Sequence, residues 1–281
     1  MPNNIRTIKK IISGKQAVDG AGVKLVRVFG NSDTKDFDPF LMLDAFDSSD
    51  PNDYVKGFPW HPHRGIETIT YLIKGDIEHG DSLGNKGSVL DGECQWMTAG
   101  SGIIHQEMPK PCERMLGVQL WLNLPAKDKM VAPKYKGILE KDITVVDEAH
   151  STVRIIAGSF NGKLGAVEGN YVKHLYLDVE VKADSEWSFE TDNGSTLFVY
   201  IIEGSGSFGS SCDEFISEKH AILFNDGNKF KVKASNNGIR FLLLSGKPLN
   251  EPIAWGGPIV MNTKEELNLA FKELDEDTFI K

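Results

Sequence analysis

The sequence predicts a mainly β protein built from two β-barrels, with a short α-helix near the C-terminal end. Most of the chain divides into short apolar segments that are rich in β-branched and aromatic residues and bounded by glycine, asparagine, aspartate or proline. A weak internal echo relates TITYLIKGDIEHGDS (68–82) to LFVYIIEGSGSFGSS (197–211), since both read as strand, glycine turn and strand. Many short strands with frequent turns are typical of a sandwich or barrel, and the echo favours a duplicated barrel.

The clearest strand signals are apolar runs with turn residues at their ends: 68–73, 118–124, 174–181, 196–202 and 240–246. The segment DSLGNKG (81–87) lies between two such runs and predicts a hairpin turn.

One segment near the C-terminal end has a helical pattern. Thr263 and Glu266 have the spacing of a capping box, which marks the start of a helix. The apolar residues that follow fall on one helical face: Leu267, Ala270, Phe271 and Leu274. We therefore expect a C-terminal helix packed on the barrel.

The length of 281 residues favours two domains of similar size. Proline and glycine interrupt a charged stretch at 130–138, where we place the linker. We accordingly predict an N-terminal barrel at 1–133 and a C-terminal barrel at 134–281, which ends in the helix.

Composition and charge exclude some partners. The chain is 40% hydrophobic and 25% charged, with a formal net charge of -9 and no basic cluster, so we expect no direct nucleic-acid partner. The opening MPNNIRTIKK lacks the apolar segment of a signal peptide, and no apolar run approaches the length of a membrane span. Three scattered cysteines without a C-x-x-C motif suit a reducing compartment. We expect a cytoplasmic protein without a membrane partner.

The stretch FPWHPHRGIETITYLIKG (58–75) carries two histidines at the mouth of a predicted strand. Residues two apart in a strand share a face, so His61 and His63 point the same way, about 7 Å apart along the strand. Pro62 between them removes a ladder donor, which predicts an edge strand or a bulge. His105 and Glu107 in GIIHQEMP repeat the spacing. If the two segments pair, three imidazoles and one carboxylate converge.

Such a donor set suits Fe, Ni, Cu, Zn or Mn, and an incomplete shell leaves positions for substrate or dioxygen. The alternative is that these histidines hydrogen-bond to the backbone at a barrel rim. Two pairs with the same spacing, each beside glycine-rich turns and an apolar strand, favour the metal site.

Three segments of the chain resemble the pirin family, which are bicupins of the cupin superfamily: 58–85, 95–109 and 256–267. The resemblance covers nearly the whole chain. It implies two cupin barrels of the jelly-roll type packed face to face. It also implies one divalent metal ion in the first barrel, most readily Fe(II), with Ni, Mn, Cu, Zn or Co as alternatives. The implied ligands are His61, His63, His105 and Glu107.

The motifs depart from the general cupin pattern in two places. In many cupins four residues separate the second histidine of H-x-H from a glutamate ligand, but only three residues separate His63 from Glu67 here. Such a slip turns a strand side chain to the opposite face, so we expect Glu107 to be the ligand and Glu67 to lie behind it or serve structure alone. Four residues separate Gly100 from His105, which fits the pirin pattern.

Pirins resemble quercetin 2,3-dioxygenases, which implies a small aromatic or enol substrate and dioxygen. In that reading Glu107 is the catalytic base for a flavonol 3-hydroxyl, and Glu67 takes this role if it reaches the pocket. Phe58 and Trp60 are candidates to flank the substrate, whereas core packing is the favoured role of Trp96 and Met97.

Two other functions remain open from the sequence. One is a non-enzymatic regulator, in which the metal or its redox state biases a surface that binds a protein partner. The other, weaker, is an isomerase or other small-molecule cupin. In the second half Glu190 and Asp192 stand where the histidine pair is echoed. Two carboxylates could hold a hard cation, but a solvated strand end is the favoured interpretation. We therefore expect that barrel to lack metal and to act as a lid, a partner surface or both.

Overall fold

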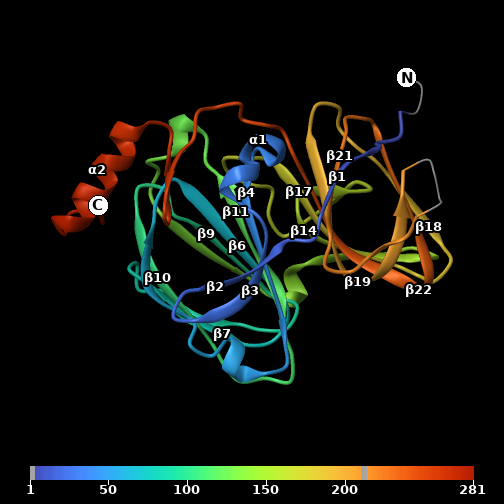
Figure 1. Cartoon of the computed structure of the whole chain (residues 1–281), viewed down its shortest axis with the longest axis horizontal. Helices are drawn as coiled ribbons and strands as arrows, with labels where there is room; N and C mark the ends of the chain where they lie inside the picture. Colours follow the sequence, from blue (N-terminus) through green and yellow to red (C-terminus); the bar gives the residue numbers. More distant parts are fainter. Residues whose placement is uncertain (1–3, 210–213) are drawn as a thin grey trace. The chain divides into compact units, whose positions relative to one another are not determined.

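The computed structural model describes residues 4–209 and 214–281 and confirms the mainly β architecture (Figure 1). Contacts divide the chain into two compact units. Unit 1 takes the described parts of Met1–Gly14, Lys35–Pro39 and Lys141–Pro248, and unit 2 takes Lys15–Thr34, Phe40–Glu140 and Leu249–Lys281. Each unit therefore contains segments from both halves of the chain.

Unit 2 is a barrel of two antiparallel sheets. The larger sheet has the strand order β12-β9-β6-β11-β4-β3-β2, and the smaller has the order β5-β10-β7-β8. The strands of the larger sheet are β2 (Lys15–Asp19), β3 (Val23–Phe29), β4 (Phe40–Ser48), β6 (Ile66–Lys74), β9 (Cys94–Thr98), β11 (Met115–Asn123) and β12 (Lys134–Ile138). Those of the smaller sheet are β5 (Phe58–His63), β7 (Ile77–Asp81), β8 (Lys86–Val89) and β10 (Ile103–Pro109). The predicted turn at 81–87 joins β7 to β8.

The C-terminal segment completes unit 2. It forms the hairpin β23 (Ala254–Gly256) and β24 (Ile259–Met261), followed by α2 (Lys264–Asp275), drawn in red at the rim of the unit (Figure 1). The capping box of Thr263 and Glu266 is present as predicted. Ala270 is buried, whereas Phe271 of the predicted apolar face is 38% exposed, because α2 packs on a narrow hairpin that covers only part of that face.

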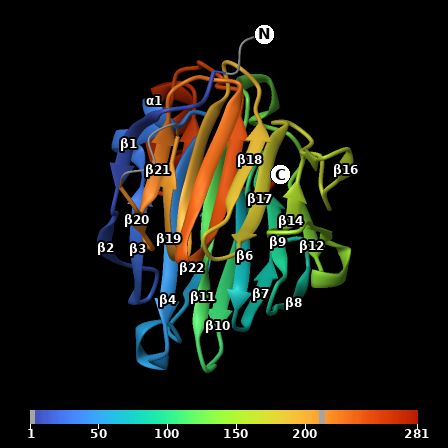
Figure 2. The same cartoon turned by 90° about the vertical axis from the view of Figure 1, so that its right-hand side faces the viewer.

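Unit 1 is built on a second antiparallel sheet in the order β1-β21-β19-β22-β17-β14-β13, and Figure 2 shows β19, β22 and β17 as neighbours. Two short strands join this sheet, β18 on β22 and β20 on β19. Its strands are β1 (Ile8–Ile12), β13 (Thr144–Asp147), β14 (Ser151–Ala157), β17 (His174–Val181), β18 (Glu186–Glu190), β19 (Thr196–Phe208), β20 (Ile216–Ser217), β21 (Ala221–Phe224) and β22 (Lys229–Gly246).

The remaining elements of the two units are short. They are the hairpin β15 (Ser159–Phe160) and β16 (Lys163–Leu164), helix α1 (Thr34–Phe37), and 3-10 turns at Asn31–Asp33, Pro51–Asp53, Ala126–Asp128 and Glu140–Asp142.

These contacts divide the chain differently from the predicted limits 1–133 and 134–281. The expected linker contains β12, which pairs with β9 of unit 2 along its whole length. The N-terminal strand β1 pairs with β21 of unit 1, and Leu249–Lys281 groups with unit 2. Local composition marked a chain interruption at 130–138, but the long-range pairing of the terminal segments has no local signal.

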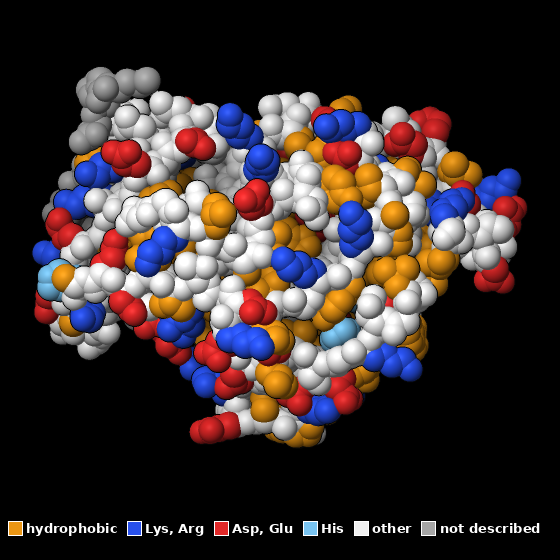
Figure 3. Space-filling view, turned by 180° about the vertical axis from the view of Figure 1, so that it is seen from behind, with side chains coloured by type: hydrophobic (Ala, Val, Ile, Leu, Met, Phe, Trp, Pro, Cys, Tyr) orange, Lys and Arg blue, Asp and Glu red, His pale blue; other side chains and the backbone are white. Residues whose placement is uncertain are grey.

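On the face seen in Figure 3, basic and acidic side chains of the described residues are interspersed. Mixed charge of this kind, with a formal net charge of -9, gives little attraction for a polyphosphate. Among the residues that the structure describes, no helix combines the length and the apolar character that crossing a membrane requires.

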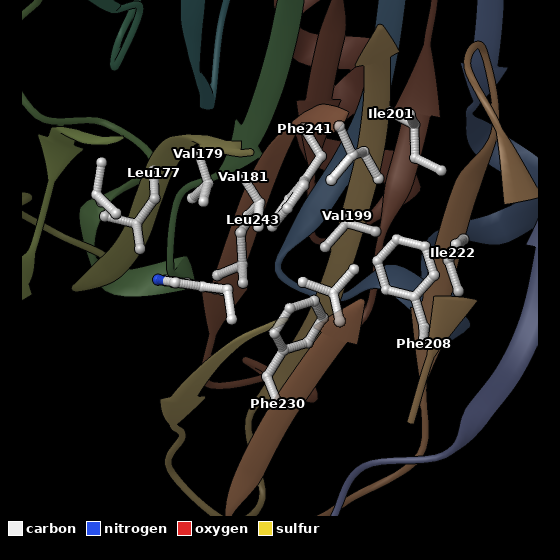
Figure 4. Close-up of a cluster of buried hydrophobic side chains, with 14 of the residues drawn as sticks. Leu177, Val179, Val181, Val199, Ile201, Phe208, Ile222, Phe230, Phe241 and Leu243 are labelled. Carbon is white, nitrogen blue, oxygen red and sulfur yellow. The ribbon is translucent and has the colours of Figure 1, made fainter. Parts of the chain in front are cut away.

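The interior of unit 1 is apolar. Figure 4 shows aliphatic and aromatic side chains from β17, β19, β21 and β22 directed toward one another, including Val199, Phe230 and Phe241. These three residues are fully buried. Burial of alternate residues along each strand provides the hydrophobic stabilisation of this barrel.

Candidate metal centre

The two histidine segments pair with each other, which is the condition on which the sequence brings their side chains together. Strand β5 pairs antiparallel with β10, with His61 opposite His105 and His63 opposite Ile103. Strand β5 is the edge strand of its sheet, which accommodates Pro62 as expected. The register shifts between His105 and Glu107, so a local irregularity separates the two residues of the second pair.

Three imidazoles meet where β5 pairs with β10. One ligand-type nitrogen from each of His61, His63 and His105 lies within 4.8 Å of the other two. Nδ1 of His61 lies 2.8 Å from the carbonyl oxygen of Pro59, and Nδ1 of His63 lies 3.0 Å from that of Pro258. Because a carbonyl oxygen only accepts, both Nδ1 atoms carry hydrogen in the neutral rings, and both Nε2 atoms present lone pairs. These two Nε2 atoms are 3.1 Å apart.

The ring nitrogens of His105 are buried and have no hydrogen-bond partner among the described residues. Burial, reinforced by His63 and His61, holds the pKa of His105 well below its usual range. Burial and the neighbouring His61 lower the pKa of His63 to about 3. Neutral imidazole is the form that binds a metal ion, and an orphaned buried nitrogen facing two lone pairs fits a cation. The residues present therefore fit a divalent metal.

Glu107 lies outside this cluster of three imidazoles. Its buried carboxylate accepts hydrogen bonds from Nε2 of Gln119 at 2.9 and 3.0 Å and from Oγ1 of Thr70 at 3.2 Å. The structure thus brings together three of the four expected ligands and holds the fourth against the facing sheet, where it lines the same cavity as His61 and His63.

Glu67 lies on the opposite face of β6 from Thr70, as the spacing predicted. It is fully buried, its Oε1 accepts a hydrogen bond from Oγ1 of Thr98 at 2.7 Å, and burial raises the pKa of Glu67. Glu67 is not among the described residues that line the cavity. We therefore leave it out of the substrate pocket, because strand alternation directs it away.

The cavity beside the histidines has a volume of about 770 Å³. Phe58 and Trp60, the expected flanking residues, both line it, and Trp60 is 53% exposed. Trp121 and Trp255 also line it and stack on each other with ring centroids 5.7 Å apart. A volume of this size with aromatic walls suits a small aromatic molecule.

A polar row crosses the inner wall of the larger sheet. Gln119 lies between Thr70 of β6 and Asp44 of β4, and Asp44 pairs in turn with Arg27 of β3. Nε and Nη2 of the Arg27 guanidinium donate to the two carboxylate oxygens of Asp44 at 2.9 and 2.8 Å. Burial raises the pKa of Asp44, and the hydrogen bonds from Arg27 oppose this effect. Arg27, Asp44, Gln119 and Thr70 thus form a polar stripe on a cavity wall that also carries apolar side chains such as Met42 and Trp121.

The sequence reasoning missed Gln119, Trp121 and Trp255. The first two had a signal, because QLW places a polar and an aromatic residue two apart in an otherwise apolar strand, and so on one face. Trp255 had none, since its place in the cavity depends on the return of the C-terminal segment to unit 2.

Two barrels of this kind define a bicupin, with the histidine cluster in one of them. The chain belongs to the pirin family: the family model Pirin matches residues 22–122, and Pirin C-terminal cupin domain matches residues 176–280. This confirms the resemblance noted in the sequence.

Individual relatives cover nearly the whole chain. The protein named "Putative quercetin 2,3-dioxygenase" from Pseudomonas aeruginosa is 42% identical over 95% of this chain and 96% of its own length. Human pirin is 35% identical over 96% of this chain and 92% of its own length. The crystal structure of a quercetin 2,3-dioxygenase from Acinetobacter baumannii is 31% identical, covers 98% of both chains and superimposes with a TM-score of 0.90.

Proposed function

We propose that this protein holds one divalent metal ion, Fe(II) foremost, in unit 2 and opens flavonol-type enol substrates with dioxygen. The observation that carries the proposal is the meeting of three imidazoles, those of His61, His63 and His105, at the edge of an aromatic cavity. Relatives named for quercetin 2,3-dioxygenase activity support the choice of reaction.

In this proposal His61, His63, His105 and Glu107 hold the ion. Imidazole with carboxylate also accepts Ni, Mn, Cu, Zn or Co, so the donor set alone does not select iron. When bound, a divalent ion would lower the pKa of a substrate hydroxyl, and a redox-active ion such as Fe(II) would also supply redox chemistry for dioxygen.

The residues of this chain bind the substrate and move its proton. Trp121, Trp255 and Phe58 present apolar surface to the two faces of a flat ring and keep water from it. Glu107 accepts the proton of the enolic hydroxyl, since its carboxylate follows His105 on β10 and lines the cavity together with His61 and His63. Gln119 holds this carboxylate in place through both of its oxygens.

Quercetin turnover tests the proposal. Anaerobically iron-loaded protein, mixed with quercetin and air-saturated buffer, should consume dioxygen and release carbon monoxide, and Glu107→Gln should abolish both. Glu67→Gln is the matched control. The Glu67 carboxyl group lies on the face of β6 that is turned away from the cavity, so this substitution should leave turnover unchanged. Absence of turnover with Fe, Ni, Mn and Cu would contradict the dioxygenase proposal.

The alternative is a metal-dependent regulator that binds a protein partner. Trp60 favours it, because this half-exposed aromatic side chain is adjacent in sequence to His61 and lies at the cavity rim. A change in the metal or its redox state would then alter the surface around Trp60. Metal binding without turnover would support this function over the dioxygenase.

A further inference from the structure

The C-terminal segment reaches the histidine cluster from far along the chain. The carbonyl oxygen of Pro258 accepts the hydrogen bond from Nδ1 of His63, although 195 residues separate them. Trp255, Gly257 and Pro258 also line the cavity. We call residues 255–279, from β23 to the end of the loop after α2, the terminal strap.

Arg64, the residue next to His63, holds one end of the terminal strap. Its side chain is 2% exposed, and Nη2 donates to the carbonyl oxygen of Phe279 at 3.0 Å. Nη1 pairs with Glu273 at 2.6 Å, and Nε donates to the carbonyl oxygen of Ser101 at 2.6 Å. The guanidinium carbon lies 4.2 Å from the centre of the Phe279 ring. A buried guanidinium with these partners holds the chain segment just after His63 to the terminal strap.

Lys129 holds the strap at a second point. Its Nζ, also buried, donates to the carbonyl oxygens of Gly65 at 2.8 Å and Val260 at 2.9 Å, and to Oδ1 of Asn123 at 2.5 Å. The backbone nitrogen of Val260 donates in turn to the carbonyl oxygen of Arg64 at 3.1 Å. One ammonium group therefore links three segments: Gly65, which follows the histidine pair, Asn123 at the end of β11, and Val260 in β24.

Two glycines permit the close approach. A Cβ on Gly65 would lie 2.0 Å from the carbonyl oxygen of Val260, and Gly65 has a φ of +76°. A Cβ on Gly102 would lie 2.8 Å from the carbonyl oxygen of Phe279. Backbone meets backbone at both places, so the strap fits against the barrel only where side chains are missing.

We propose that the terminal strap is part of the metal centre and that metal binding and strap docking are coupled. The carbonyl group of Pro258 fixes the Nδ1–H tautomer and the ring orientation of His63, so that Nε2 faces the ion. Arg64 and Lys129 are positioning residues that hold this carbonyl in place. The inference rests on the proposed metal centre, because it assigns to the strap the partner that orients a metal ligand.

Co²⁺ binding and amide hydrogen exchange test the coupling. In the full-length protein, Glu273→Gln combined with Phe279→Ala removes the carboxylate and the ring that anchor Arg64. We expect affinity for Co²⁺ to fall about tenfold, as for other residues that orient metal ligands, and the visible Co²⁺ spectrum to change. By reciprocity, Co²⁺ should slow amide exchange at 255–261 in the wild type, and less in the variant.

Glu276→Gln is the matched control, since Glu276 is the C-cap residue of α2 and its carboxylate forms a salt bridge with the exposed Lys272. If the double variant fails to fold, Glu273→Gln alone should weaken Co²⁺ binding in the same direction. Wild-type affinity in the folded variants, or exchange at 255–261 that ignores Co²⁺, would overturn the coupling alone. A wild-type protein that binds no Co²⁺ would overturn the metal centre and the coupling together.

Discussion

Nε2 of His61 and Nε2 of His63 lie 3.1 Å apart, and a backbone carbonyl accepts from the Nδ1 atom of each ring. Two lone pairs at this distance repel each other unless a proton or a cation lies near them. Burial disfavours the proton, because it lowers the pKa of His63 to about 3. The pair is thus arranged for a metal ion at neutral pH.

Removing a ligand should remove the metal without unfolding the barrel. His63→Ala and Glu107→Ala should each lose most of the metal bound by the wild type, measured by elemental analysis of protein from cells not overloaded with one ion. Circular dichroism should show the native β content. His220→Ala in unit 1 is the control. Unchanged metal content in both ligand variants would refute the assignment.

Gln119 should stabilise the metal-free state in particular. In Gln119→Leu the buried carboxylate of Glu107 loses its hydrogen bonds from Gln119, and among the described residues Thr70 remains as a donor. The free energy of unfolding of the metal-free protein should therefore fall by about 1–3 kcal/mol. Bound metal would satisfy the carboxylate, so the rise in melting temperature on metal addition should exceed that of the wild type.

Gln106→Leu is the control for this change, because Gln106 alternates with Glu107 along β10 and points to the other face. Equal metal-induced shifts in Gln119→Leu and the wild type would show that Glu107 does not exchange between Gln119 and the ion.

Gly65→Ala should damage the protein far more than Gly84→Ala. Both glycines have positive φ, +76° and +90°, so both variants pay about 1 kcal/mol of backbone strain. Only at Gly65 does the added Cβ collide with the backbone, at Val260, whereas nothing lies within 4 Å of it at Gly84. Thermal unfolding should show the difference, and similar melting temperatures would contradict the close packing of the strap.

Acid should destabilise the protein partly through His174. This side chain is buried in unit 1, and burial lowers its pKa from 6.5 to about 4. The unfolded chain therefore binds a proton first as the pH falls, and up to about 3 kcal/mol of unfolding free energy is lost between pH 6.5 and 4.

Denaturant unfolding across this pH range should show a shallower loss for His174→Gln than for the wild type. His150→Gln, at an exposed position, should follow the wild type. Parallel curves for His174→Gln and the wild type would contradict the role of this imidazole.

Local patterns predicted most of the fold and half of the site. Alternation of two residues placed His61 with His63 and turned Glu67 away, and a capping box located α2. The partners of these residues could not be predicted in the same way. Pro258 and Trp255 reach the site only after a long-range return of the chain, and the position of Glu107 depends on a register shift in β10.

Because residues 4–14 group with unit 1 and Leu249–Lys281 groups with unit 2, no single cut of the chain separates the two units. A fragment ending at residue 140 would retain the histidines but lose the carbonyl that orients one of them, and the complementary fragment would lack β1, which leaves β21 as an open edge. Two such fragments should regain the native fold only when produced together. During synthesis, the His63 ring should reach its final orientation only after the segment around Pro258 has left the ribosome.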